Sequence, residues 1–212
     1  MEKDSQMKKG ICYLIGAGDF GDGTPSPRPE DLVIAGDGGF RHCQERGIRV
    51  DLTVGDFDSL GYRPDHPHVL QLPAEKDDTD MRAALNLGWE RGYRDFRLYG
   101  GTGGRISHTM ANIQLLTELA ARGGRGVLVG EDSWYRVLRN DRWEFDGSET
   151  GYLSVFSLSD RAEGVREQGL KYEVQDVTLT NEYPVGVSNE FTGRTGVVSV
   201  REGTLLLIRE GR

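Results

Sequence analysis

Short apolar runs alternate with amphipathic stretches over the first two thirds of the chain. Runs of this kind, bounded by Gly, Pro or Asp, are typical of strands that are covered on both faces. The predicted strands span residues 11–15, 32–35, 52–54, 69–72, 96–99 and 127–129. Between them, apolar residues recur at helical spacing around residues 81–88 and 110–120. This alternation predicts βαβ units with right-handed crossovers, and therefore an α/β domain built on a parallel sheet.

The pattern changes after about residue 135. Helical spacing fades, and short strand-like runs follow at residues 143–145, 152–158, 173–179, 186–191, 197–201 and 204–208. Glu202 and Gly203 fit the two-residue turn of a hairpin between the last two runs. Regular short strands predict a small sandwich or barrel-like domain. We therefore predict an N-terminal parallel-sheet α/β domain over residues 1–135, followed by a smaller all-β sandwich domain over residues 136–212.

Composition narrows the class of protein. The 212 residues can bury a real core, and 28% charged residues with a mean hydropathy of −0.52 indicate a soluble globular protein. The net charge of −8 and the lack of a long basic run argue against nucleic acid or an anionic membrane as a partner. Neither a signal-peptide pattern nor an apolar run of about 20 residues is present, so we predict a cytoplasmic location. Cys12 lies in an apolar run and is expected to be a buried, reduced thiol.

Five aspartates follow three of the predicted strands, at the points where loops begin. They are Asp37, Asp56, Asp58, Asp77 and Asp80. Because the carboxyl ends of parallel strands share one edge of a sheet, these residues are expected to converge. All five would be charged at neutral pH, and a divalent cation relieves the repulsion between them. Mg²⁺ prefers carboxylates, waters and substrate phosphates together, so the series predicts a Mg²⁺–phosphate site.

Each acidic segment also has a purely structural interpretation. Asp56 and Asp58 stand two residues apart, so an extended backbone points both carboxylates to one side, but Asp and Gly also favour turns. The stretch Asp77-Asp78-Thr79-Asp80 precedes a predicted helix, where Asp and Thr serve as N-caps. Capping is expected to use one of these residues while Asp80 turns inward.

A glycine-rich loop precedes the second predicted helix. Gly100-Gly101-Thr102-Gly103-Gly104-Arg105 is neither a dinucleotide fingerprint nor a P-loop, but its glycines let backbone N–H groups approach phosphate oxygens. Arg105 can donate bidentately to a phosphate. His108 is either a phosphate or ribose contact or a plain residue of the first helical turn. Further along, Ser188 and Asn189 either hydrogen-bond a neutral heterocycle or are the solvated residues of an edge strand.

In this order, the motifs resemble the thiamine pyrophosphokinase (thiamine diphosphokinase) family. The resemblance runs from about residue 11 to residue 208. The matching segments are Gly36-Asp37-Gly38-Gly39, Gly55-Asp56-Phe57-Asp58-Ser59, Lys76-Asp77-Asp78-Thr79-Asp80, the glycine loop with Arg105 and His108, and the tail Val187-Ser188-Asn189-Glu190-Phe191.

The resemblance implies a catalytic α/β domain, a thiamine-binding β-sandwich domain, and a homodimer whose active site lies at the subunit interface. The activity it implies is the Mg²⁺-dependent transfer of pyrophosphate from ATP to the hydroxyl of thiamine, which gives thiamine diphosphate and AMP. It implies that Ser188 and Asn189 bind thiamine. The implied Mg²⁺ ligands are Asp37, Asp56, Asp58 and Asp80. The implied catalytic residues are Asp56, Asp58, Asp77, Asp80 and Arg105. The implied contacts to ATP and its phosphates are Asp37, Thr79, Gly101, Gly103, Gly104, Arg105 and His108.

The chain departs from the family pattern in two places. Ser107 stands where the family carries an acidic residue, and Asp78 is a candidate to compensate. No tryptophan accompanies Ser188, so Phe191 or Tyr183 would have to stack on the pyrimidine. Three alternatives therefore stay open: a pyrophosphokinase for another alcohol such as a hydroxymethylpterin, a nucleotide- or thiamine-binding regulator without catalysis, and a Mg²⁺-dependent nucleotide hydrolase.

Overall fold

The computed structural model describes residues 10–21, 23–58, 60–73 and 78–211. The chain divides into two compact units. Unit 1 comprises Met1–Leu115 and Gly123–Glu131, and unit 2 comprises Leu116–Arg122 and Asp132–Arg212. The predicted domain boundary between residues 135 and 136 stays a prediction.

Unit 1 contains a parallel sheet, as the alternating pattern predicts. Its strands are β1 (Ile11–Ile15), β2 (Leu32–Gly36), β3 (Leu52–Gly55), β4 (Val69–Gln71), β5 (Asp95–Tyr99) and β6 (Arg125–Val129). They lie in the order β6-β5-β1-β2-β3-β4, and every one of these neighbouring pairs is parallel. The strand order changes direction at β1, which lies between β2 and β5. Ligands of open α/β sheets bind at the strand carboxyl ends beside such a point.

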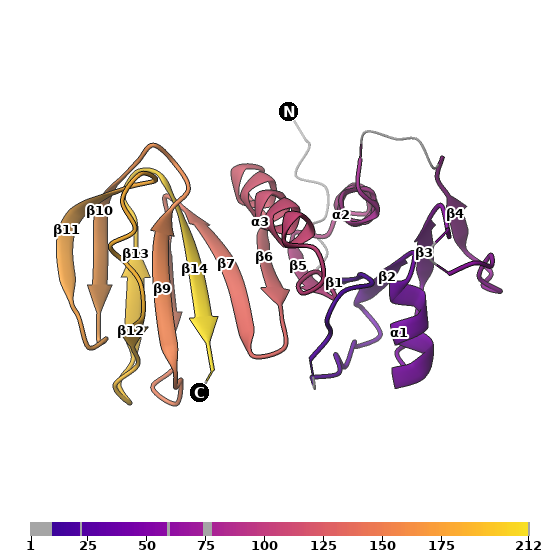
Figure 1. Ribbon diagram of the computed structural model, residues 1–212, viewed down its shortest axis with the longest axis horizontal. Helices are drawn as coiled ribbons and strands as arrows, with labels where there is room; N and C mark the ends of the chain where they lie inside the picture. Colours follow the sequence, from indigo (N-terminus) through magenta and orange to yellow (C-terminus); the bar gives the residue numbers. More distant parts are fainter. Residues whose placement is uncertain (1–9, 22, 59, 74–77, 212) are drawn as a thin grey trace. The chain divides into compact units, whose positions relative to one another are not determined.

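Two helices of unit 1 pack on opposite faces of this sheet, as Figure 1 shows for α1 (Gly39–Arg46) and α2 (Asp80–Glu90). Successive side chains of β1 point alternately toward the two helices. Its residues Tyr13 and Ile15 pack in one cluster with Phe40 of α1, while Cys12 lies beside Gly88 of α2. The third helix, α3 (Ile106–Ala121), follows β5 and extends further toward its N-terminus than the predicted span. Helix α1 was not predicted, because it is short and mostly polar.

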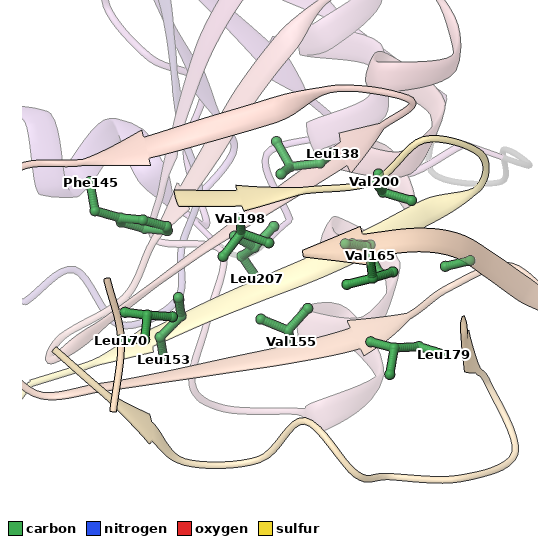
Figure 2. Packing of buried hydrophobic residues seen from close by; sticks show 12 residues of the cluster. Leu138, Phe145, Leu153, Val155, Val165, Leu170, Leu179, Val198, Val200 and Leu207 are labelled. Atoms are coloured by element: carbon green, nitrogen blue, oxygen red, sulfur yellow. The ribbon is translucent and has the colours of Figure 1, made fainter. Parts of the chain in front are cut away.

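Unit 2 is built from two antiparallel sheets, which confirms the predicted β-rich second half. Its strands are β7 (Ser133–Arg139), β8 (Arg142–Phe145), β9 (Tyr152–Ser157), β10 (Arg161–Gln168), β11 (Val174–Thr180), β12 (Asn189–Glu190), β13 (Gly196–Ser199) and β14 (Thr204–Glu210). One sheet has the order β12-β9-β14-β7 and the other β11-β10-β13-β8. Figure 2 shows the core between them, where Leu153, Val155 and Leu207 of the first sheet meet Val165, Leu179 and Val198 of the second.

Two details of the second half differ from the prediction. The hairpin predicted at Glu202 and Gly203 is wrong, because β13 and β14 belong to different sheets and the chain crosses the sandwich at this turn. Strands β7 and β10 were not predicted. In β10, Gly164 adopts a left-handed φ of 66° at a register irregularity, and charged residues interrupt the apolar alternation. One of them, Glu167, lies on the core-facing side of the strand and is buried.

The predicted state of Cys12 is confirmed, since Cys12 and Cys43 are both free and buried. Burial raises the pKa of the Cys43 thiol to about 12 and raises that of Cys12 further, so both thiols stay protonated at neutral pH. Within the described part of the chain, no helix is both long and apolar enough to cross a bilayer.

Candidate active site

Three aspartates meet at the carboxyl edge of the unit 1 sheet. Asp37 follows β2, Asp56 follows β3, and Asp80 is the first residue of α2. Each offers one carboxylate oxygen, and these oxygens lie within 4.8 Å of one another. At such separations each charged pair repels by roughly 1 to 3 kcal/mol at effective dielectric constants between 80 and 20. Opposite ligands of a hard divalent cation are about 4 to 5 Å apart, so the spacing fits such an ion.

Asp37 carries the sharpest signal in this group. Its backbone adopts a φ of 28°, which L-residues rarely do, and is held there by its N–H, which donates to the Val54 carbonyl at 2.9 Å. The side chain is 8% exposed, and its Oδ1 is buried without a hydrogen-bond partner among the described residues. A buried carboxylate oxygen without a partner is costly, which is typical of an atom that awaits a ligand.

Asp58 and Thr79 combine structural and site positions. Both line the same cleft as the three aspartates. The Asp58 N–H donates to Asp56 Oδ1 at 3.2 Å, so the turn interpretation of this segment also holds. The Thr79 hydroxyl caps α2 by accepting the Arg82 N–H at 3.2 Å, as the helix-start pattern predicts for one residue of this stretch. Asp58 is exposed and lies outside the group of three, so its role as a metal ligand stays a prediction.

Two other acidic residues of the same segment do not add to the cluster. Asp78 forms an ion pair with Arg82 one turn along α2, so its carboxylate is already engaged. It therefore gives no support to the idea that it compensates for Ser107, which is an exposed residue in the first turn of α3. Asp77 lies outside the described residues, and its predicted catalytic role stays a prediction.

The glycine loop lines the same cleft as the aspartates. It is fixed against the segment after β1, where the Gly18 N–H donates to the Gly100 carbonyl at 2.8 Å. From α3, the buried Asn112 amide donates to the Gly101 carbonyl at 2.7 Å. Gly100 and Gly103 adopt left-handed φ angles of 61° and 72°, which only glycine adopts without strain. The loop is therefore a preorganised backbone rather than a mobile linker.

Arg105 and His108 complete the cleft from the start of α3. Both side chains are exposed, and Arg105 makes no ion pair with any of the described acidic residues. The cleft has a volume of about 470 Å³, which is the size of a small-molecule site. Of the residues assigned to the cation and nucleotide from the sequence, it is lined by Asp37, Asp56, Asp58, Thr79, Asp80, Gly101, Gly103, Gly104, Arg105 and His108. Grouped carboxylates, a glycine loop and a basic residue in one cleft suit a phosphate-bearing ligand with its cation.

Several cleft residues escaped the sequence prediction. They are Gly16, Ala17, Gly18, Met81, Ala111 and Asn112. The first three follow β1 directly, so the rule that placed the aspartates at strand ends would have placed this segment as well. Asn112 was harder to predict. Its position one turn after His108 shows only that the two residues lie on the same side of the helix, and it does not show that Asn112 reaches the cleft.

The residues assigned to thiamine lie in unit 2. Ser188 is exposed and adopts a left-handed φ of 57°. Asn189 is buried, with an exposed fraction of 6%. Both of its amide hydrogens are donated, to Glu167 Oε2 at 2.8 Å and to the Tyr172 carbonyl at 2.7 Å. Its Oδ1 accepts two backbone N–H groups, from Tyr172 and Glu190, at 2.9 Å each. A direct contact between Asn189 and a ligand would therefore break an existing hydrogen bond.

The candidate stacking residues differ in their availability. Phe191 packs edge-on against Phe145 at a ring separation of 5.3 Å and belongs to the sandwich core. Tyr183 is 70% exposed, and so is much of Tyr172, at 60%. A ligand ring can therefore reach the two tyrosines more readily than Phe191.

A parallel sheet that ends in grouped carboxylates, with a glycine loop and an arginine lining the same cleft, is the arrangement of an α/β enzyme of phosphoryl transfer. Comparison with known proteins specifies the family. Residues 28–127 match the family described as "Thiamin pyrophosphokinase, catalytic domain", and residues 142–205 match "Thiamin pyrophosphokinase, vitamin B1 binding domain". The chain therefore belongs to the thiamin pyrophosphokinase family.

Similar proteins agree with this assignment. The thiamine pyrophosphokinase of Bacillus subtilis (strain 168) is 28% identical over 185 residues, which cover 84% of this chain and 86% of that protein. The crystal structure of a Bacillus subtilis thiamine pyrophosphokinase has a TM-score of 0.83 at 25% identity and covers 95% of this chain and 99% of that one. The structure of thiamin pyrophosphokinase from Geobacillus thermodenitrificans has a TM-score of 0.79 at 28% identity, with coverages of 95% and 98%.

Proposed function

We propose that this enzyme transfers the pyrophosphoryl group of ATP to the hydroxyl of thiamine, giving thiamine diphosphate and AMP, with Mg²⁺ as the cofactor. The observations that carry the proposal are the grouped carboxylates of Asp37, Asp56 and Asp80 and the buried Oδ1 of Asp37, which has no hydrogen-bond partner among the described residues. These oxygens are the ligand type and spacing that Mg²⁺ takes in proteins. We assign Asp58 as a fourth, outer contact from the same cleft. When bound, Mg²⁺ would neutralise charge on the ATP phosphates.

The chain's own groups account for the remaining steps. Pyrophosphoryl transfer is mainly a problem of positioning and charge neutralisation. The thiamine hydroxyl oxygen bonds to the β-phosphorus, the bond from that phosphorus to the α–β bridging oxygen breaks, and AMP leaves with the bridging oxygen. Arg105 and the backbone of Gly101–Gly104 bind the oxygens of the transferred group. The hydroxyl proton passes to an aspartate carboxylate, for which Asp77 and Asp80 are the candidates; of these, Asp80 lines the described cleft.

Ser188 is proposed to contact thiamine in unit 2, and its replacement by alanine tests this role. The change should raise the thiamine KM by about 3- to 10-fold, the effect of one hydrogen bond, while the ATP KM changes by less than twofold. Steady-state kinetics with each substrate varied in turn measures both constants. Ser148→Ala, at an exposed serine whose backbone N–H bonds Asp146, is the matched control. Equal effects of Ser188→Ala on both KM values would contradict selective thiamine recognition.

We further propose that the chain works as a homodimer, with the active site shared between subunits. The support is an apolar strip in unit 2. Tyr183, Val185 and Val187 alternate along the chain and are 70%, 58% and 52% exposed. Exposed apolar side chains so close together in the sequence are candidates for an interaction surface. Sedimentation equilibrium should give twice the chain mass for the wild type, and Tyr183→Ser with Val185→Ser should shift it toward the monomer. A wild-type protein that is monomeric at micromolar concentration would contradict the proposal.

An acceptor panel separates the proposed activity from its alternatives. Purified protein is incubated with ATP and Mg²⁺ alone, with thiamine, or with 6-hydroxymethyl-7,8-dihydropterin. We expect nucleotide consumption only with thiamine. Consumption with the pterin alone would identify a different pyrophosphokinase, and consumption without any acceptor would identify a hydrolase. Thiamine binding without turnover would identify a regulator.

A further inference from the structure

The inner face of β10 carries an unexpected carboxylate. Glu167 is 5% exposed and lies two residues after the buried Val165, on the same side of the strand. Its neighbours in register are Val174 of β11 and Val198 of β13. A sandwich core normally has an apolar residue at such a position. Burial raises the pKa of the Glu167 carboxyl, which reflects the cost of enclosing a charge there.

One side chain meets this carboxylate across the sandwich. Asn189 of β12, in the other sheet, donates an amide hydrogen to Glu167 Oε2 at 2.8 Å. Two backbone N–H groups already require the Asn189 carbonyl oxygen on their side, so the amide can adopt only one orientation. Glu167 supplies the acceptor that the enclosed amide hydrogen then needs. We call this pair the Glu167–Asn189 clamp.

The clamp fixes two chain segments that each expose a side chain. Asn189 binds both the N–H and the carbonyl of Tyr172, whose ring is 60% exposed. Ser188, which precedes Asn189 in the chain, adopts a left-handed backbone with a φ of 57°, which is strained in a non-glycine residue. Its N–H donates to the Ser154 hydroxyl at 3.1 Å. Hydrogen bonds to buried groups therefore hold the Ser188 and Tyr172 segments in one arrangement.

Stability alone does not account for Glu167. A buried charged group pays a desolvation penalty, and replacing a buried polar pair as a whole by apolar residues of similar size is often neutral or stabilising. Removing Glu167 alone would instead leave the Asn189 amide hydrogen without its acceptor. Valine, which flanks Glu167 in both neighbouring strands, would suit the position as a β-former. What valine could not do is accept the Asn189 amide hydrogen.

We infer that Glu167 is a positioning residue for thiamine recognition, acting through Asn189 on Ser188 and Tyr172. The inference rests on the proposed function, because it presumes that thiamine binds at this surface. It also changes the role expected of Asn189. Its amide is occupied by the protein, so Asn189 shapes the binding surface rather than contacting the vitamin.

Kinetics of three variants test the inference. Glu167→Val should raise the thiamine KM by about 10-fold or more, with the ATP KM within twofold. The melting temperature should fall, because the enclosed Asn189 amide hydrogen loses its acceptor. Glu167→Gln keeps an acceptor oxygen at the same place, so it should retain a thiamine KM within about threefold of the wild type. Gln168→Val, at the exposed neighbour on the same strand, controls for a new valine in β10. A Glu167→Val protein with an unchanged thiamine KM would overturn the inference, as would an equal rise in both KM values.

A coupling measurement decides the case if Glu167→Val folds poorly. Glu167→Thr replaces the carboxylate with a shorter β-former and is combined with Asn189→Ala. If Glu167 acts through Asn189, the double variant should have a thiamine KM within about twofold of that of Asn189→Ala alone. Independent, multiplying effects would overturn the inference. If wild-type protein neither binds nor converts thiamine, the proposed function fails instead, and the two failures are thereby distinguished.

Discussion

Asp56→Asn should lower kcat by about a hundredfold or more while leaving the fold intact. Asn keeps the size of the side chain but removes one of three carboxylates whose oxygens lie within 4.8 Å of one another. Loss of a ligand charge weakens cation binding and the electrostatic stabilisation that dominates such transfers. The same change relieves repulsion within the group, so the protein without Mg²⁺ should melt at the same temperature or higher.

Thermal melting gives this prediction a readout that is independent of turnover. Wild-type protein should be stabilised by added Mg²⁺, because a ligand that binds only the folded state raises its stability. Asp56→Asn should lose most of this increase. Asp65→Asn removes a charge at an exposed aspartate outside the cleft and should change neither kcat nor the Mg²⁺ effect. Near-normal turnover in Asp56→Asn, with an unchanged circular dichroism spectrum, would contradict the assigned role.

Gly100→Ala is expected to be among the most destabilising single changes in unit 1. The residue adopts a left-handed φ of 61°, and an added Cβ would lie 2.2 Å from the backbone oxygen of Gly16. Backbone strain and this clash together should cost about 2 to 4 kcal/mol of unfolding free energy. The clash separates the two segments that wall the cleft, so kcat should fall as well.

Gly104→Ala is the matched control for this effect. Gly104 has a similar φ of 55°, but an added Cβ would meet nothing within 4 Å. It should therefore lose only the cost of the left-handed backbone, about 1 kcal/mol. Urea unfolding followed by circular dichroism measures both changes. Equal losses in the two variants would show that the contact with Gly16 contributes nothing.

Much of the nucleotide-side arrangement follows from the sequence, because one rule of parallel sheets is strong. Asp37, Asp56 and Asp80 are separated along the chain, yet each follows an apolar strand-like run or opens the next helix. Strand carboxyl ends share an edge, so their meeting was predictable without any contact information. The same rule also places Gly16–Gly18 at this edge, but the segment was not predicted because it has no charged side chain.

The second unit was harder to predict, for physical reasons that particular residues show. Strand β10 combines a glycine at a register irregularity with an inward-facing Glu167, which erases the period-two alternation that marks a strand. The turn at Glu202 and Gly203 has hairpin residues, but the strands it joins pair with partners far away in sequence. Three of the four hydrogen bonds of Asn189 are likewise tertiary, so local sequence cannot tell a binding amide from a buried one.

Product stoichiometry tests the central claim most directly. Purified protein is incubated with ATP, Mg²⁺ and thiamine, and the nucleotides and thiamine esters are resolved by chromatography over time. Pyrophosphoryl transfer predicts AMP and thiamine diphosphate in equal amounts, both absent when thiamine is omitted. ADP together with thiamine monophosphate, or AMP formed without thiamine, would contradict it.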